Sequence, residues 1–103
     1  MITRFEWDPA KALANARKHD VTFHDAIQIF DDPFALSEQD RVEGGEYRWQ
    51  TIGMAGDAAV LLVAHTSHDL DEDDIVVRVI SARRADRRER KRYEQAIRDL
   101  QPR

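Results

Sequence analysis

The sequence predicts an α+β fold in which an antiparallel four-stranded sheet packs against helices, with elements in the order β-α-α-β-β-β-β-α. Strand-forming runs, rich in β-branched or aromatic residues, follow one another through the middle of the chain with only short polar segments between them. Sequential strands joined by short turns pair antiparallel. Apolar residues recur at helical intervals before and after this block, so we place helices on both sides of it.

The composition indicates one globular domain spanning residues 1–103. Of these residues 42% are apolar and 35% charged, which suits a single core that needs no metal or disulfide. The absence of cysteine excludes disulfides, a thiolate nucleophile and cysteine zinc sites, and it is compatible with a reducing cytoplasm. No apolar run approaches the ~20 residues of a membrane span, so we expect a cytoplasmic protein without a membrane partner.

The first helix has clear start and stop signals. After the short extended entry Phe5–Trp7, Asp8 can cap free amides and Pro9 has its φ preset for a first helical turn. The helix is expected to end at Lys18 or His19, because cations favour a helix C-terminus.

The second predicted helix is short. Thr22 is its expected cap, and Pro33 ends it because proline disfavours helix at the preceding residue. Its apolar residues recur with helical spacing and form one face: Phe23, Ala26, Ile27 and Phe30.

The first half of the sheet is expected in residues 34–52. Residues 34–38 are a weakly signalled strand, and 39–46 are a polar hairpin connection containing two glycines. In the next strand, 47–52, alternation separates two faces. One face carries Tyr47, Trp49 and Thr51, and the other carries Arg48, Gln50 and Ile52.

The second half of the sheet is more apolar. After a turn at 54–57, residues 58–66 form a buried strand in which Leu61, Val63 and His65 share one face. An acidic loop, 67–74, leads to a strand starting at Ile75, whose run of β-branched residues predicts a central strand covered on both faces.

The last helix changes character along its length. Asp86 is the expected N-cap, with Glu89 at capping-box spacing. Its second half packs through apolar residues at helical intervals: Tyr93, Ala96, Ile97 and Leu100. Around its start lie seven cations in ten positions: Arg83, Arg84, Arg87, Arg88, Arg90, Lys91 and Arg92.

The basic segment makes the charge distribution along the chain uneven. The net charge of −4 combines −10 over residues 1–77 with +6 over 78–103. A local basic patch can bind phosphate despite the overall sign, because screening confines each field to about 8 Å at physiological salt. The alternative is an ordinary solvated helix face whose charges pair locally.

RNA cleavage without a metal needs proton-transfer groups and cations that stabilise the charge of the transition state. A histidine, with an unperturbed pKa of ~6.5, suits proton transfer near neutrality. The candidates are His19 or His65 for proton transfer, Tyr93 as a donor, and Arg48, Arg83 and Arg84 for charge. The alternatives are ordinary: His65 as a satisfied core residue and Tyr93 as a core anchor. Metal sites at His65–His68 or in the acidic loop lack the required ligand spacing, so no metal and no cofactor is expected.

Three stretches resemble one known family. FEWDPAKALANARKHDVTF near the start, FDDP after the second helix and ISARRADRRERKRYE near the end are similar to the BrnT family, the toxin half of bacterial BrnT/BrnA type II toxin–antitoxin pairs. The resemblance covers nearly the whole chain. Two departures are Asp20, where the family usually has glycine, and the unusually acidic loop Asp69–Asp74.

The resemblance implies a RelE-like ribonuclease fold and RNA cleavage that arrests translation. It also implies neutralisation by a BrnA-like antitoxin with a ribbon-helix-helix DNA-binding domain, so that DNA is reached only indirectly. The motif residues of the family fall on Lys18, His19, Ser81, Ala82, Arg83, Arg84, Glu89 and Tyr93. With the rest of the basic segment, we expect Lys18, Arg84, Arg87 and Arg88 to bind substrate and Glu89 to join the catalytic group. The alternative function is a non-catalytic partner-binding module of a transcriptional autoregulation complex.

Overall fold

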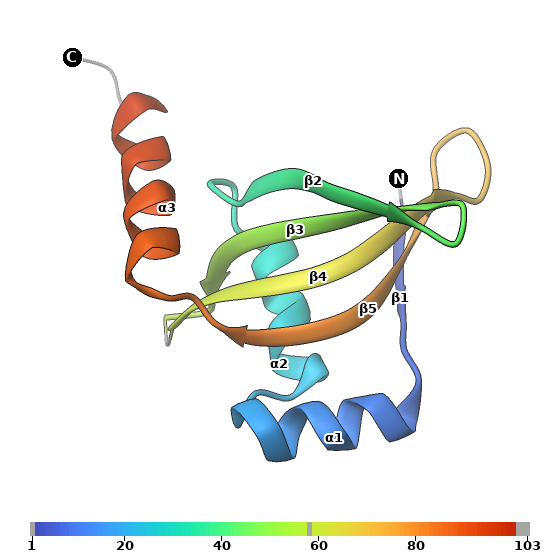
Figure 1. Cartoon of the computed structure of the whole chain (residues 1–103). Coiled ribbons are helices and arrows are strands. Elements are labelled where there is room, and N and C mark those ends of the chain that lie inside the picture. The colour runs from blue at the N-terminus through green and yellow to red at the C-terminus, as the bar shows by residue number, and fades with distance from the viewer. Residues whose placement is uncertain (1, 58, 101–103) are drawn as a thin grey trace.

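The computed structural model describes residues 2–57 and 59–100 and contains one mixed five-stranded sheet (Figure 1). The strands lie in the order β1-β5-β4-β3-β2. Their bounds are β1 Thr3–Glu6, β2 Leu36–Glu43, β3 Glu46–Ala55, β4 Ala59–Asp69 and β5 Ile75–Arg84. The helices are α1 Pro9–His19, α2 Phe23–Ala26, the 3₁₀ helix η1 Ile27–Asp31, and α3 Arg87–Leu100.

The predicted four-stranded antiparallel sheet is wrong in one respect. The extended entry forms β1, which pairs parallel with β5 from Thr3 opposite Ile75 to Glu6 opposite Arg78. The other three pairings are antiparallel, as expected. A parallel pair needs a long crossover, and here residues 7–74 separate the two strands. Because two helices, the 3₁₀ helix and three strands lie between β1 and β5 in the chain, no local sequence pattern predicts that these two strands pair.

The two connections of the sheet are shorter than predicted. The β2–β3 turn contains only Gly44 and Gly45, both with positive φ, because β2 extends to Glu43. The strand expected at 34–38 therefore begins later and runs much longer. Similarly, β4 extends through Asp69 into the segment predicted as an acidic loop. Residue 58, the expected start of that strand, lies outside the described residues.

One face of the sheet, here called the inner face, is covered by α1, α2 and η1, which lie below the strands in Figure 1. The largest core cluster forms there, with buried Phe23 and Ile29 packed against Val63, Val79 and Ala82. The predicted caps of the first two helices are present: the Asp8 carboxylate accepts from the Ala10 amide and the Thr22 hydroxyl accepts from the Asp25 amide. The expected second helix is α-helical only to Ala26 and continues as η1.

A buried asparagine fastens α1 to the sheet. The Asn15 amide nitrogen donates to Ala82 O at 2.8 Å and to Val21 O at 3.0 Å, and its oxygen accepts from the Ala82 amide at 3.0 Å. β1 pairs with β5 only as far as Arg78, so the second half of β5 is an edge. Asn15 forms hydrogen bonds with the backbone groups of Ala82, which have no neighbouring strand on that edge among the described residues. The prediction of a central last strand thus holds only for its first half, since β4 occupies the centre of the sheet.

The opposite, outer face is covered at one end by α3. A second core cluster joins Tyr93 of α3 to Ile52 and Leu62, with Ile97 packed against it. Figure 1 shows α3 standing apart from the other helices, beside the end of the sheet where β5 finishes. No helix in the described parts of the chain is long and apolar enough to cross a membrane.

Candidate functional site

Three elements meet where β5 ends: β5 itself, the start of α3, and the end of α1. We call this region the β5 corner. Asn15 ties α1 to Ala82 of β5, and His19 follows Asn15 by four residues on the same side of the helix. His19 is half-buried and Lys18 exposed. Asp20 ends α1 in the left-handed conformation, with φ 56°. The fold therefore brings the Lys18–His19 turn to the strand that carries Arg83.

Arg83 and Glu89 form the strongest charged contact of the corner. Arg83 donates from both terminal nitrogens to the two Glu89 oxygens, at 2.8 and 3.0 Å. The predicted capping box is present as well, because Glu89 accepts from the Asp86 amide and the Asp86 side chain accepts from the Glu89 amide. The bond from Arg83 lowers the pKa of Glu89 despite partial burial, and Glu89 raises the pKa of Arg83. Glu89 is thus an ionised carboxylate near neutrality.

Tyr93 is one helical turn further along α3 and serves as an anchor in this structure. It is buried, with 4% of its surface exposed, and its hydroxyl donates to Asp32. Burial, reinforced by the Asp32 carboxylate, raises the pKa of Tyr93 to about 12. Burial also raises the pKa of Asp32, but bonds from Tyr93 and the Met54 and Phe34 amides outweigh it and lower that pKa overall. The hydroxyl of Tyr93 is therefore engaged, and its proton is firmly held.

The remaining cations of the basic segment are solvent-facing. Arg84, Arg87 and Arg88 are exposed around the corner. Arg84 follows Arg83 and points to the other side of the strand, where it lines a hollow with Asp20 and other residues. Arg87 and Arg88 are therefore exposed at the start of α3, and Arg84 is exposed on the side of β5 opposite Arg83.

Arg48 belongs to the same face as Arg83 but lies further along the sheet. The register places Ile52, Leu62 and Arg83 in one row, and Arg48 projects four positions away, roughly 13 Å, next to Thr66. Only 21% of the Arg48 side chain is exposed, so it is less superficial than the sequence suggested.

Arg48 retains capacity to bind an anion. Its Nε lies 3.9 Å from Glu43, too far for a hydrogen bond, and in the described part of the chain Nε has no hydrogen-bond partner. Thr66 Oγ1, on the neighbouring strand, is likewise buried without a partner among these residues.

Carboxylates that the sequence did not single out organise the other arginines of the outer face. Arg78 donates to Glu46 at 2.7 Å, and Arg92 of α3 reaches Glu38 of β2 at 2.6 Å. These partners are tens of residues apart, so only strand register and helix docking reveal them. We call Arg48, Arg78, Arg83 and Arg92 together the arginine face.

His65 is not part of this arrangement. Alternation places it on the inner face, and it is 5% exposed, with its ring edge-on to Phe30 at 5.0 Å. Nε2 lies 2.7 Å from Thr51 Oγ1, and Nδ1 lies 3.2 Å from Thr66 O. Burial lowers the pKa of His65, although the Thr66 carbonyl opposes the shift. The sheet separates His65 from the arginine face, whereas His19 lies at the β5 corner.

Metal-ligating side chains are not gathered in the described ranges. Across residues 2–57 and 59–100, no three histidine or acidic side chains are placed to hold a metal ion together. In the acidic loop after β4, the Asp71 carboxylate instead accepts hydrogen bonds from the backbone amides of Asp73 and Asp74.

The fold and the site define a small α+β protein whose sheet and last helix carry four arginines, each beside a carboxylate. The chain belongs to the family described as the ribonuclease toxin, BrnT, of type II toxin–antitoxin systems, whose model matches residues 7–89. Among solved structures, the ribonuclease toxin BrnT of Brucella abortus is similar with a TM-score of 0.57. The similarity covers 84% of this chain and 100% of that one at 19% identity, so it shows the shared fold. No match was found among curated proteins.

Proposed function

We propose that this BrnT-family toxin is a metal-independent endoribonuclease that cleaves RNA in the cytoplasm and thereby arrests translation. We further propose that a BrnA-like antitoxin with a ribbon-helix-helix domain neutralises it, and that the toxin reaches DNA only through that antitoxin. Membership of the ribonuclease toxin family supports the reaction class. Likeness to the broader RelE-like toxins remains a prediction.

The observation that carries the proposal is the Arg83–Glu89 pair at the end of β5, the strand to which Asn15 ties α1. Cleavage by attack of a 2′-hydroxyl requires removal of its proton, protonation of the leaving oxygen, and stabilisation of negative charge on the phosphate. Arg83, held in place by Glu89, supplies fixed positive charge at the corner. The exposed cations Arg84, Arg87 and Arg88 near the end of β5 bind flanking phosphates through charge.

Proton transfer is assigned to groups at the same corner. Glu89 is ionised, but the bonds from Arg83 that lower its pKa weaken it as a base, so His19 is the better candidate to accept or donate a proton. Tyr93 is a weaker candidate than the sequence suggested, because Asp32 engages its hydroxyl. His65 is weaker still, since the sheet separates it from Arg83.

The proposal is tested by incubating purified, antitoxin-free protein with RNA in excess EDTA over pH 5–9. We expect cleavage to persist, and Arg83→Ala to lower the rate by ~10²–10³, the usual cost of one charge-stabilising contact in a sheltered site. His19→Ala should impair cleavage and change the pH profile more than His65→Ala does.

Arg98→Ala is the matched control. Arg98 is an exposed arginine in the last turn of α3, so its loss changes the net charge equally but leaves the corner intact. Abolition by EDTA with rescue by a divalent ion would overturn the metal-free mechanism. Full activity of Arg83→Ala would remove the β5 corner from the reaction.

The second candidate function, a non-catalytic partner-binding module, is favoured by the pairing of the arginines. Arg78, Arg83 and Arg92 are each already bound to a carboxylate in the free chain. A docking surface needs no proton-transfer group. Folded protein that binds its antitoxin but never cleaves RNA, with or without divalent ions, would establish this alternative.

A further inference from the structure

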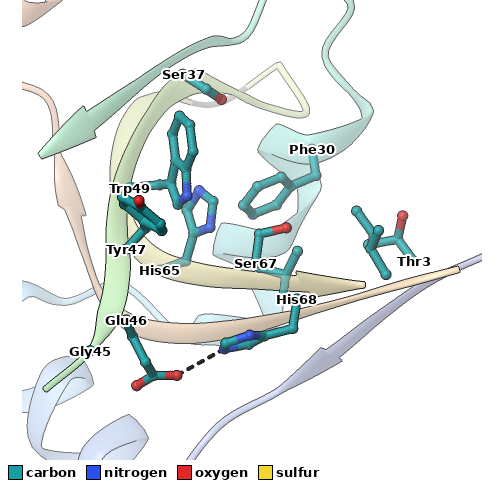
Figure 2. Close-up of a pocket in the computed structure, with 12 residues that line it drawn as sticks. Thr3, Phe30, Ser37, Gly45, Glu46, Tyr47, Trp49, His65, Ser67 and His68 are labelled. Carbon is teal, nitrogen blue, oxygen red and sulfur yellow. Dashed lines mark hydrogen bonds and ion pairs between the residues drawn. The ribbon is translucent and has the colours of Figure 1, made fainter. Parts of the chain in front are cut away.

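The sheet contains a second feature, a cavity on the inner face that α1, α2 and η1 leave open. Its volume is about 660 Å³. Figure 2 shows Phe30 and Trp49 on either side of His65, with Tyr47 beside them and the Ser37 and Ser67 hydroxyls nearby. Tyr47 is 59% exposed, so the mouth of the cavity carries an accessible aromatic ring. The cavity combines aromatic walls with a few hydroxyl groups.

A chain of hydrogen bonds sets which of these hydroxyls can accept. Ser37 Oγ lies 2.8 Å from Thr51 Oγ1, which lies 2.7 Å from His65 Nε2. The Thr66 carbonyl can only accept, so His65 Nδ1 must donate to it, and the buried neutral ring must accept at Nε2. Thr51 therefore donates to His65, and Ser37 donates to Thr51. Ser37 is left with only lone pairs to offer to the cavity.

An ion-pair cluster links the cavity to the arginine face. Glu46 and His68 both line the cavity. Glu46 accepts from Arg78 of the arginine face and lies 2.8 Å from His68 Nε2, the contact dashed in Figure 2. Hydrogen bonds from Arg78 and then His68 lower the pKa of Glu46. The Glu46–His68 pair thus stands between the cavity and Arg78.

We propose that this cavity is a nucleobase subsite, in which a base of the bound RNA stacks on Trp49 and Tyr47 while Ser37 accepts from its amino group. The inference rests on the proposed function, because it takes RNA as the substrate. Single-stranded RNA is recognised by stacking unpaired bases on aromatic side chains and reading their edges by hydrogen bonds. A flat base with polar edges matches these walls and hydroxyls. An apolar partner side chain would make no use of the free lone pairs of Ser37.

The subsite is tested through tryptophan fluorescence. The chain has two tryptophans, and Trp7 packs on Phe23 in the core, so Trp7→Phe leaves Trp49 as the single reporter. The probe is a 2′-O-methyl RNA oligonucleotide, whose blocked hydroxyl prevents cleavage. We expect saturable quenching of Trp49. Tyr47→Ala in the same background should weaken binding about tenfold, as expected for a lost base-stacking contact.

Phe34→Ala is the matched control, because Phe34 is an exposed aromatic residue that lines a different hollow, beside Tyr93. We expect it to leave the Kd unchanged. Absence of quenching, or equal effects of Tyr47→Ala and Phe34→Ala, would overturn the subsite. So would quenching of Trp49 by purified antitoxin but not by the oligonucleotide, which would assign the cavity to a protein partner.

Base preference provides a second readout. With Ser37 accepting, oligo-A and oligo-C, which carry exocyclic amino groups, should bind more tightly than oligo-U, and Ser37→Ala should reduce the difference. An unchanged preference would remove Ser37 from recognition. The subsite and the catalytic proposal can fail independently. If the oligonucleotide quenches Trp49 but ordinary RNA is not cleaved, the subsite stands and the catalytic proposal is rejected. If RNA is cleaved and Tyr47→Ala leaves the KM unchanged, the catalytic proposal stands and the subsite is rejected.

Discussion

The two faces of the sheet carry different kinds of polar residues. On the inner face, the polar groups are neutral and buried, and Asn15 and His65 each have their hydrogen-bonding atoms matched by fixed partners. On the outer face, the polar groups are charged and partly exposed, and arginines pair one by one with carboxylates. Buried polar groups must be satisfied, whereas exposed ion pairs contribute little to stability.

This difference between the faces predicts which property each substitution should change. A change at an inner-face polar group should appear mainly in the free energy of unfolding. A change at an outer-face arginine should appear mainly in binding and catalysis, because water can replace its partner. The following variants test that division.

Asn15→Ala should have the largest effect on stability. It removes three hydrogen bonds and leaves backbone groups of Ala82 and Val21 buried without partners, at about 1–3 kcal/mol for each unsatisfied group. We expect a loss of several kcal/mol in denaturant unfolding. Gln95→Ala, which removes one exposed contact on α3, is the control and should change stability by less than about 0.5 kcal/mol. Equal effects would contradict the division.

His65 should make stability depend on pH. Its pKa is lowered in the folded state, so below ~6.5 the unfolded chain binds a proton that the folded chain does not. The stability contributed by the neutral ring is complete above pH 6.5. It is lost by up to about 1.4 kcal/mol per pH unit as the pH falls towards the folded pKa. Unfolding curves at pH 7.5, 6.5 and 5.5 measure this slope, and His65→Gln should flatten it. A slope that the substitution leaves unchanged would assign the effect to another group.

Neutralisation is predicted to cover the Arg83–Arg92 surface. Exposed cations around the β5 corner offer a partner complementary charge and fast, salt-sensitive association. Arg84→Ala and Arg83→Ala should weaken antitoxin binding by about 1 kcal/mol each and reduce its salt dependence. Titrations over a salt series measure both quantities. Unchanged affinity together with unchanged salt dependence would place the interface elsewhere.

Arg48→Ala should have the smallest effect on the fold while lowering toxicity. Its one ion pair, to Glu43, is long, so its removal should change the thermal midpoint by only a few degrees. Loss of one phosphate contact should reduce activity about tenfold. Growth arrest and thermal unfolding are compared for the same variant. Full toxicity, or loss of folding, would remove Arg48 from the site.

Local chemistry made several features predictable. The caps at Asp8, Thr22 and Asp86 follow from residue types within three positions of each helix start, and all three are present. Period-two alternation correctly separated Trp49 from Arg48, since a strand turns successive side chains to opposite faces.

The candidate site was only partly predictable. Clustering in the sequence identified Arg83, and capping-box spacing identified Glu89, but the spacing did not indicate that the same carboxylate holds the Arg83 guanidinium. Asn15, which brings the end of α1 to β5, reads in the sequence as an unremarkable helix residue.

Helix starts, alternating faces, the basic segment and the family resemblance could all be recognised in the sequence, because each depends on residues close together in the chain. Three contacts could be found only in the folded protein: the parallel pairing of β1 with β5, the Asn15–Ala82 bonds across 67 residues, and the Tyr93–Asp32 bond across 61. These contacts join backbone edges and single polar groups, which carry no periodic signature. They form only when packing of the whole core brings distant segments within hydrogen-bonding distance.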